Sequence, residues 1–168
     1  MVDSQNLILS SEQVSQKIKR MAFQIFENNH EEKELIIAGI WLQGYKLAEL
    51  LMNELQKIAK FKIELMKLEL DKELPTQSEI SLDKDVEMVR DKVVILVDDV
   101  LNTGRTLAYS LKPFLKLRVK KIETASLVNR SHTNFPISCT YTGYELSTTI
   151  NDHVAVEIEG ERMQVYLR

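Results

Sequence analysis

Cysteine, proline and glycine are scarce in this sequence, and long apolar runs are absent. Its 168 residues include one cysteine, three prolines and five glycines. Because the single cysteine, Cys139, cannot form an internal disulfide, a disulfide-rich secreted scaffold is excluded, and we interpret Cys139 as a packing residue. No apolar run approaches the roughly 18 residues that span a bilayer, and the first residues lack the pattern of a signal peptide. We therefore expect a cytoplasmic protein that makes no contact with membranes.

A large excess of either charge is also missing. The sequence has 22 basic and 25 acidic residues, a formal net charge of −3 and a pI near 5.7. No overall positive field therefore attracts the protein to nucleic acid, although this balance is compatible with a local basic patch. The length, with 44% hydrophobic and 28% charged residues, predicts one globular domain over residues 1–168.

The hydrophobic pattern alternates between helical and strand-like periods. Ser10 and Gln13 have the form of a capping box, and apolar residues then recur at helical spacing until Asn28 and Asn29. Later segments are predicted as a strand over 35–40, a helix from Gly44, a strand from Phe61 with a bulge or break near Met66, a short strand over 80–82, a strand over 120–128 and a hairpin that turns at Gly160. This order predicts an α/β fold with a mostly parallel sheet.

The most informative stretch of the sequence begins with an apolar run followed by two acids. Residues 93–97 are apolar without alternation, which predicts a strand that is buried on both faces and ends abruptly. Asp98 and Asp99 follow at its carboxyl end, where open α/β sheets bind ligands. Two adjacent carboxylates at that position are therefore candidate site residues.

The turn that follows the two acids is rich in hydrogen-bond donors. Residues 102–106 supply hydroxyls, a glycine and backbone N–H groups, and no Gly-x-Gly-x-x-Gly or P-loop motif is present elsewhere. A helix is predicted after the turn from Leu107, Ala108, Leu111, Phe114 and Leu115. Because free N–H groups at a helix start bind anions, we interpret the turn as a phosphate-binding loop. For the turn alone, the alternative is an ordinary strand-to-helix connection with Thr103 or Thr106 as the N-cap.

This stretch resembles the 5-phosphoribosyl 1-pyrophosphate motif of the type I phosphoribosyltransferases, in which an apolar strand leads into two acids and a Thr-Gly-x-Thr loop. It is most similar to the family members that attenuate the pyrimidine operon and double as uracil phosphoribosyltransferases. The resemblance implies a mostly parallel central sheet flanked by helices, with a small hood built from terminal and loop segments. It implies that Asp98 and Asp99 hold the ribose hydroxyls and contact Mg²⁺. The residues implied in binding the rest of that substrate are Val100, Leu101, Asn102, Thr103, Gly104, Arg105 and Thr106.

The resemblance places the family's pyrophosphate loop at residues 39–44. This loop consists of Gly39, Ile40, Trp41, Leu42, Gln43 and Gly44. Relatives carry lysine and arginine in the loop, and the absence of these cations here predicts slow turnover. On the residues alone, glycines that permit close packing of a strand and a helix are an equal alternative.

Two further regions are assigned by the same resemblance. Lys67 falls where relatives carry a cation that closes over pyrophosphate, although a solvated strand lysine is the alternative; residues 71–79 correspond to the mobile catalytic loop. Residues 127–137 resemble the nucleobase side of the family's site, although Tyr144 stands where a lysine is usual. The base-binding residues that this implies are Val128, Asn129, Arg130 and His132.

The resemblance implies an enzyme that transfers the phosphoribosyl group of 5-phosphoribosyl 1-pyrophosphate to a nucleobase, with uracil the expected base, and releases pyrophosphate. Mg²⁺ is expected mainly on the pyrophosphate of the substrate, and a homodimer is implied. The missing loop cations leave an alternative, a weakly active or inactive nucleotide-sensing regulator of pyrimidine genes that binds RNA. The acidic pI argues against the RNA binding.

Overall fold

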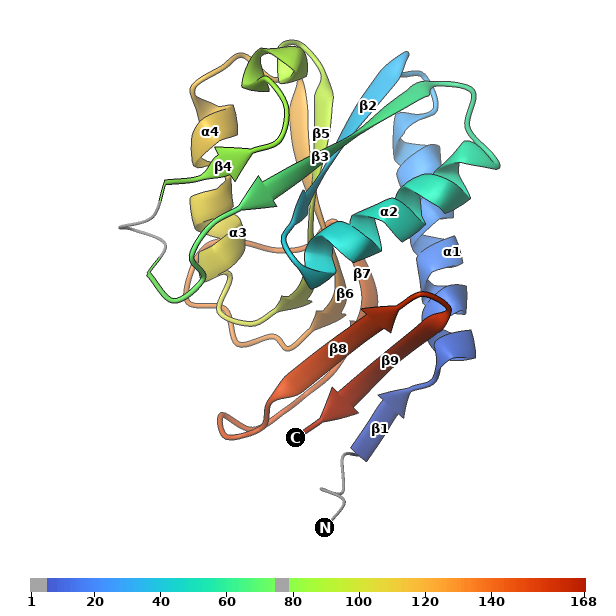
Figure 1. Ribbon diagram of the computed structural model, residues 1–168, viewed down its shortest axis with the longest axis vertical. Coiled ribbons are helices and arrows are strands. Elements are labelled where there is room, and N and C mark those ends of the chain that lie inside the picture. The colour runs from blue at the N-terminus through green and yellow to red at the C-terminus, as the bar shows by residue number, and fades with distance from the viewer. Residues whose placement is uncertain (1–5, 75–78) are drawn as a thin grey trace.

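The computed structural model describes residues 6–74 and 79–168 (Figure 1). The elements in these ranges are, in chain order, β1 (Asn6–Leu9), α1 (Ser11–Asn29), β2 (Glu34–Ile40), α2 (Gln43–Gln56), β3 (Lys62–Glu69), β4 (Ser81–Leu82), the 3₁₀ helix η1 (Val86–Val89), β5 (Val93–Leu101), α3 (Arg105–Ser110), α4 (Lys112–Leu115), β6 (Lys121–Asn129), β7 (Tyr141–Glu145), β8 (Val154–Glu159) and β9 (Arg162–Leu167).

Six strands form the main sheet, in the order β4-β3-β2-β5-β6-β7. All neighbouring pairs are parallel except β3 with β4, so the predicted mostly parallel α/β fold is confirmed. β5 lies in the interior of the sheet, and its residues 93–97 are fully buried. A strand covered on both faces accepts only apolar residues there, which is why the hydrophobic run in the sequence does not alternate.

Helices cover both faces of the main sheet (Figure 1). α1 and α2 lie over one face and contribute to one hydrophobic core, whereas α3, α4 and η1 lie over the other face and a second core. The predicted capping box at the start of α1 is present, with Ser10 and Gln13 each bonded to the backbone N–H of the other. No helix in the described ranges has both the length and the apolar character needed to cross a membrane.

A second, smaller sheet lies beside the carboxyl-end edge of the main one (Figure 1). Its three antiparallel strands have the order β1-β9-β8, so residues far apart in the chain are paired. The hairpin predicted to turn at Gly160 is confirmed as β8 and β9, with Gly160 at a φ of +60°. The strand β1 that completes this sheet carries no periodic signal in its four residues.

The predicted bulge or break near Met66 is wrong. β3 keeps an uninterrupted parallel register with β2, from Glu34 opposite Lys62 to Ile40 opposite Leu68. The apolar pattern changes parity because a different face of the strand is covered in each half. The first half packs against the core under α2, and the second half packs against the core on the opposite face.

The prediction of a single helix after residue 106 is also wrong, because the segment divides into α3 and α4. Pro113 lies in the first turn of α4 and has no backbone N–H with which to continue the preceding helix. Leu107 and Phe114 are buried as expected, but Leu115 is 67% exposed and does not belong to the apolar face. The charged connection before β5 contains η1, whose Val89 is fully buried.

Candidate functional site

Asp98 and Asp99 lie within a strand, because β5 continues past both acids to Leu101. The predicted strand end at residue 97 is therefore wrong. Pairing with β6 continues, with Asp98 opposite Ser126. The Asp98 side chain is 3% exposed and that of Asp99 is 18% exposed. The two carboxylates thus differ strongly in their contact with solvent.

Lys72 forms an ion pair with this acid pair. Its Nζ lies 3.0 Å from Oδ1 of Asp98 and 3.7 Å from Oδ1 of Asp99. The backbone N–H of Asp99 donates a second hydrogen bond, of 3.0 Å, to the same Asp98 oxygen. Sequence reasoning did not identify Lys72, which lies in a polar connection after β3 that carries no motif pointing to this lysine.

Burial changes the ionisation of this cluster. Burial of Asp98 and the adjacent Asp99 carboxylate raise the pKa of Asp98 to about 8, although Lys72 acts in the opposite direction. Burial also opposes the charge on Lys72, but the two carboxylates outweigh it and raise the pKa of Lys72. Near neutral pH, the substrate-free cluster therefore holds a proton on the acid pair beside a charged lysine.

The turn after β5 has the geometry of an open loop. Gly104 is the N-cap of α3, has a φ of +84° and makes no side-chain cap, so the alternative with Thr103 or Thr106 as N-cap is wrong. The hydroxyl of Thr103 instead accepts from the N–H of Arg105 at 3.3 Å, and its carbonyl accepts from the N–H of Asn134 at 2.8 Å. The first N–H groups of an α-helix have no partner within the helix, and beyond Arg105, whose N–H donates to Thr103, those of α3 could donate to an anion.

One cavity of about 560 Å³ brings the acids and the loop together. One wall consists of Asp98, Asp99, Val100, Leu101, Asn102, Thr103, Gly104, Arg105, Thr106 and Leu107. Lys72 lies in the lining, and the opposite wall is made by residues 153–156 at the start of β8. His153, which sequence reasoning missed, also lines this wall. Both acids and the whole predicted phosphate loop therefore share a single cavity.

Residues 39–44 lie beside this cavity and do not line it. A Cβ on Gly39 would lie 2.6 Å from Cα of Tyr45, and a Cβ on Gly44 would lie 2.8 Å from the Val97 carbonyl and 3.1 Å from Oδ1 of Asp98. Both glycines therefore permit close packing of α2 on the sheet, as the alternative interpretation of this loop expects.

The other residues of this loop differ in exposure. Ile40 is buried, whereas Trp41 and Leu42 are 43% and 40% exposed, and the peptide bond between them is cis. The side chain of Gln43 accepts from the N–H of Ile158 in β8 at 3.2 Å. Gln43 is therefore engaged with the small sheet.

Lys67 does not reach the acid pair. Its Nζ lies 3.2 Å from Oε1 of Glu69 and 4.9 Å from the centre of the Trp41 ring. Lys67 is therefore adjacent to the expected pyrophosphate loop, on the side of the exposed Trp41, and Lys72 is the lysine that contacts the acids. The segment expected to be the mobile loop, residues 71–79, includes residues 75–78, which lie outside the described part of the chain.

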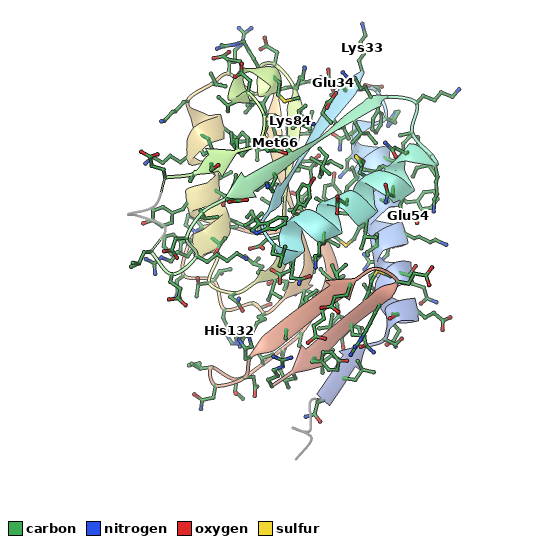
Figure 2. The ribbon with its side chains drawn as sticks, in the orientation of Figure 1. Lys33, Glu34, Glu54, Met66, Lys84 and His132 are labelled. Atoms are coloured by element: carbon green, nitrogen blue, oxygen red, sulfur yellow. The ribbon has the colours of Figure 1, made fainter. Side chains whose placement is uncertain are left out.

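The residues expected to bind the base follow β6 but differ in accessibility. Val128 is fully buried, and Arg130 is 9% exposed. The Asn129 amide donates to Glu145 at 3.3 Å, and Nε2 of His132 lies 2.8 Å from the Thr148 carbonyl oxygen. Figure 2 places His132 near the start of β8, at the end of the molecule opposite Lys33 and Glu34. A second cavity of about 410 Å³ is lined by Asn102, Thr103, residues 130–134 and Ile150.

Comparison with known proteins assigns the family. The model of the phosphoribosyl transferase domain matches residues 4–160. The chain belongs to this family. The predicted resemblance is confirmed, and the chain is a phosphoribosyltransferase.

Named relatives and solved structures agree with this family. The bifunctional protein PyrR of Staphylococcus carnosus is 35% identical over 164 residues, which cover 93% of each chain. The bifunctional protein PyrR of Haemophilus ducreyi is 32% identical over 162 residues, covering 92% of this chain and 90% of the relative. The crystal structure of the hypoxanthine phosphoribosyltransferase of Trypanosoma cruzi superposes with a TM-score of 0.78 at 15% identity and covers 95% of both chains, which shows the shared fold.

The carboxylates of this phosphoribosyltransferase suit an Mg²⁺ ion that arrives with the substrate. No cluster of three potential metal ligands occurs among the residues that the structure describes. Mg²⁺ loses its waters reluctantly and is commonly bound through one or two carboxylates together with substrate phosphates. Asp98 already accepts from Lys72 and from a backbone N–H, so the more exposed Asp99 is the more open ligand.

Proposed function

We propose that this phosphoribosyltransferase transfers the phosphoribosyl group of 5-phosphoribosyl 1-pyrophosphate to a nucleobase, with uracil preferred, and releases pyrophosphate. The observation that carries the proposal is the single cavity shared by Asp98, Asp99 and the loop over residues 102–106. The carboxylates would accept from the ribose hydroxyls, and the loop N–H groups would donate to the 5′-phosphate. One substrate molecule with a diol and a phosphate satisfies both ends of the cavity.

The chemistry breaks the bond from the anomeric carbon to pyrophosphate and forms a bond from that carbon to a base nitrogen. Positive charge develops on the sugar during the transfer, and ionised Asp98 and Asp99 beside the hydroxyls would stabilise it. Mg²⁺, bound mainly to the pyrophosphate, would neutralise the leaving group. Because burial and the adjacent Asp99 raise the pKa of Asp98 in the free protein, substrate and metal would have to favour its ionised form as they bind.

The choice of uracil rests on the resemblance of residues 127–137 to the base side of the uracil-specific members of the family. The neutral Gln43, already bonded to β8, supports slow turnover, because the loop offers the leaving group no cation. We further propose a single domain over residues 1–168 in which the small sheet is the hood. The single cysteine supports a cytoplasmic protein, and the family resemblance supports a homodimer.

Two relatives are each named as bifunctional, which supports a second role. The family resemblance implies that this role would be that of a nucleotide-sensing regulator of pyrimidine genes that binds RNA. The pI near 5.7 opposes it, because phosphate contacts by lysine and arginine provide most RNA affinity. RNA mobility shifts at increasing salt test this role. A specific complex that weakens steeply with salt would support it, and the absence of any complex at low salt would exclude it.

Pyrophosphate release measured with uracil, hypoxanthine and guanine tests the transferase proposal. We expect turnover with uracil, and we expect Asp98→Asn combined with Asp99→Asn to abolish it, because neutral amides lose the charge that matches the cationic sugar. Asp91→Asn is the control, since Asp91 is paired with Arg118 on the surface. Activity with a purine but not with uracil would contradict the base assignment, and unchanged kinetics in the double variant would contradict the site.

A further inference from the structure

Arg130 is the most extensively bonded side chain near the cavity, although it does not line that cavity. Its guanidinium donates to four acceptors: Oδ1 of Asn102 at 2.8 Å, Oγ1 of Thr148 at 3.0 Å, the Thr149 carbonyl at 3.1 Å and the Asp152 carbonyl at 2.7 Å. Its backbone N–H donates to the Leu101 carbonyl at 3.0 Å. A guanidinium with these partners has little capacity left to read a base.

One partner of Arg130, Asn102, lies in a wall of the cavity, and the other three lie in the segment that leads into the β8 wall. Asn102 opens the phosphate loop, and Asp152 immediately precedes residues 153–156, the β8 wall. The guanidinium is planar and rigid, and its hydrogen bonds are charge-assisted, so its four bonds fix the two segments relative to each other. A lysine has one ammonium group and cannot reproduce this arrangement.

The segment that Arg130 contacts before β8 is itself a closed turn. The Asp152 carboxylate accepts from the Thr149 N–H at 2.7 Å and from the Thr149 hydroxyl at 2.8 Å. Arg130 donates to the backbone carbonyls of both residues, so it holds both ends of this turn. Displacement of the turn would carry His153 and the rest of the β8 wall with it, because they are continuous in the chain.

We infer that Arg130 is a positioning residue that sets the spacing between the phosphate loop and the β8 wall, and is not a base ligand. Only the expected effect on binding of the phosphoribosyl group rests on the proposed function. Loss of the Arg130 contacts should loosen the loop over residues 102–107 even in the absence of substrate. It should also weaken binding of the phosphoribosyl group, because the loop would no longer be held in place.

Thr148→Val tests this inference, because Thr148 is absent from the lining of both cavities and contacts Arg130 from the β8 side. We expect hydrogen exchange of the backbone amides over residues 102–107 to become about 3- to 10-fold faster, the effect of losing one contact in a coupled network. Arg130→Lys should have a larger effect. Thr140→Val is the matched control, since the Thr140 hydroxyl accepts from the N–H of Thr124 and has no contact with Arg130.

A double-mutant cycle separates Arg130 from His132, whose ring also lies 3.2 Å from the Thr148 hydroxyl. If Thr148 acts through Arg130, Thr148→Val adds little in the Arg130→Lys background. Should Arg130→Lys not fold, Asn102→Ala takes its place in the cycle. Unchanged exchange in Thr148→Val, or effects that add in full, would overturn the inference.

Ribose 5-phosphate affinity, measured by calorimetry, gives a second readout. The dissociation constant should rise about 3- to 10-fold in Thr148→Val and remain at the wild-type value in Thr140→Val. Equal affinity in Thr148→Val and the wild type would count against the role of Arg130. A wild-type protein that does not bind ribose 5-phosphate would contradict the proposed function, and the exchange cycle would still decide whether Arg130 positions the loop.

Discussion

At the scale of single residues, Asp98 shows how burial alters a carboxyl group that the sequence identifies by type. The pair Asp98 and Asp99 was predicted as a candidate site because two acids directly follow a buried apolar run, near the edge where α/β sheets bind ligands. The burial of Asp98 and its contact with Lys72 were not predictable, because the lysine is 26 residues away in a segment without a motif. His153 escaped prediction for the same reason, since only the tertiary structure brings it to the cavity.

The raised pKa of Asp98 predicts a pH-dependent stability in the metal-free, substrate-free protein. The folded protein keeps a proton on Asp98 up to its pKa of about 8, whereas the unfolded chain releases it above the ordinary value of 3.8. The contribution of this proton to stability is therefore complete below about pH 4 and is lost as the pH rises to about 8. The free energy of unfolding should fall by at most about 1.4 kcal/mol per pH unit within that window.

Chemical denaturation at pH 5.5, 6.5, 7.5 and 8.5 checks this prediction. Asp98→Asn cannot titrate, so the difference between the wild type and this variant isolates the Asp98 contribution from that of other groups. The wild type should lose stability relative to the variant up to about pH 8 and then remain level. A constant difference between the two proteins across the series would show that Asp98 does not titrate in this window.

At the scale of elements, long periodic segments were predicted well and short ones were not. α1, β2, β6 and the β8–β9 hairpin agree with their hydrophobic periods, because each has one kind of environment along its length. β3 was misread because the covered face changes halfway along it. β1 and β7 are too short to carry a period, and Pro113 divides the helix after the phosphate loop although the apolar spacing continues.

The phosphate loop supplies a prediction at this scale through Gly104. Gly104→Val should abolish ribose 5-phosphate binding while the fold persists. A residue with a Cβ is strained at a φ of +84°, and the added Cβ would lie 3.2 Å from Cβ of Ile137. We expect a loss of about 1–3 kcal/mol in the free energy of unfolding from the backbone strain. Calorimetric titration and urea unfolding provide the two measurements.

Gly160→Val is the control for this substitution. Gly160 also has a positive φ, +60°, but a Cβ there would meet no atom within 4 Å. The control should therefore lose stability by backbone strain and keep its affinity for ribose 5-phosphate. Retained binding in Gly104→Val, or equal loss of binding in both variants, would refute a specific role for the loop.

At the scale of the whole molecule, α2 fastens the small sheet to the main one. Within that sheet β8 pairs only with β9, and both backbone groups of Ile158 are bonded to side chains of α2. Gln43 accepts from the Ile158 N–H at 3.2 Å, and Nζ of Lys46 donates to the Ile158 carbonyl at 2.9 Å. Gln43, which stands where a loop cation was expected, thus has a structural role. An arginine at residue 43 could not fill this role, because an arginine side chain accepts no hydrogen bond.

Lys46→Met should therefore destabilise the attachment of β8. We expect a loss of about 1.5–3 kcal/mol in the free energy of unfolding, the usual contribution of a hydrogen bond to a charged group. Lys57→Met, at the end of the same helix, removes an exposed pair with Glu54 and should change stability by less than about 0.5 kcal/mol. Urea unfolding of the two variants compares them directly, and equal losses would show that the contact to Ile158 contributes nothing.

The pairing of residues 6–9 with residues 165–167 also has a consequence for synthesis on the ribosome. Proteins emerge from the ribosome amino-terminal end first, so the strands from β2 to β6 are available to pair before β8 and β9 exist. The acids and the phosphate loop are then already made, but the wall formed by residues 153–156 is not. A nascent chain that ends before β8 therefore lacks one wall of this cavity, and we expect it to bind ribose 5-phosphate only after synthesis has passed residue 156.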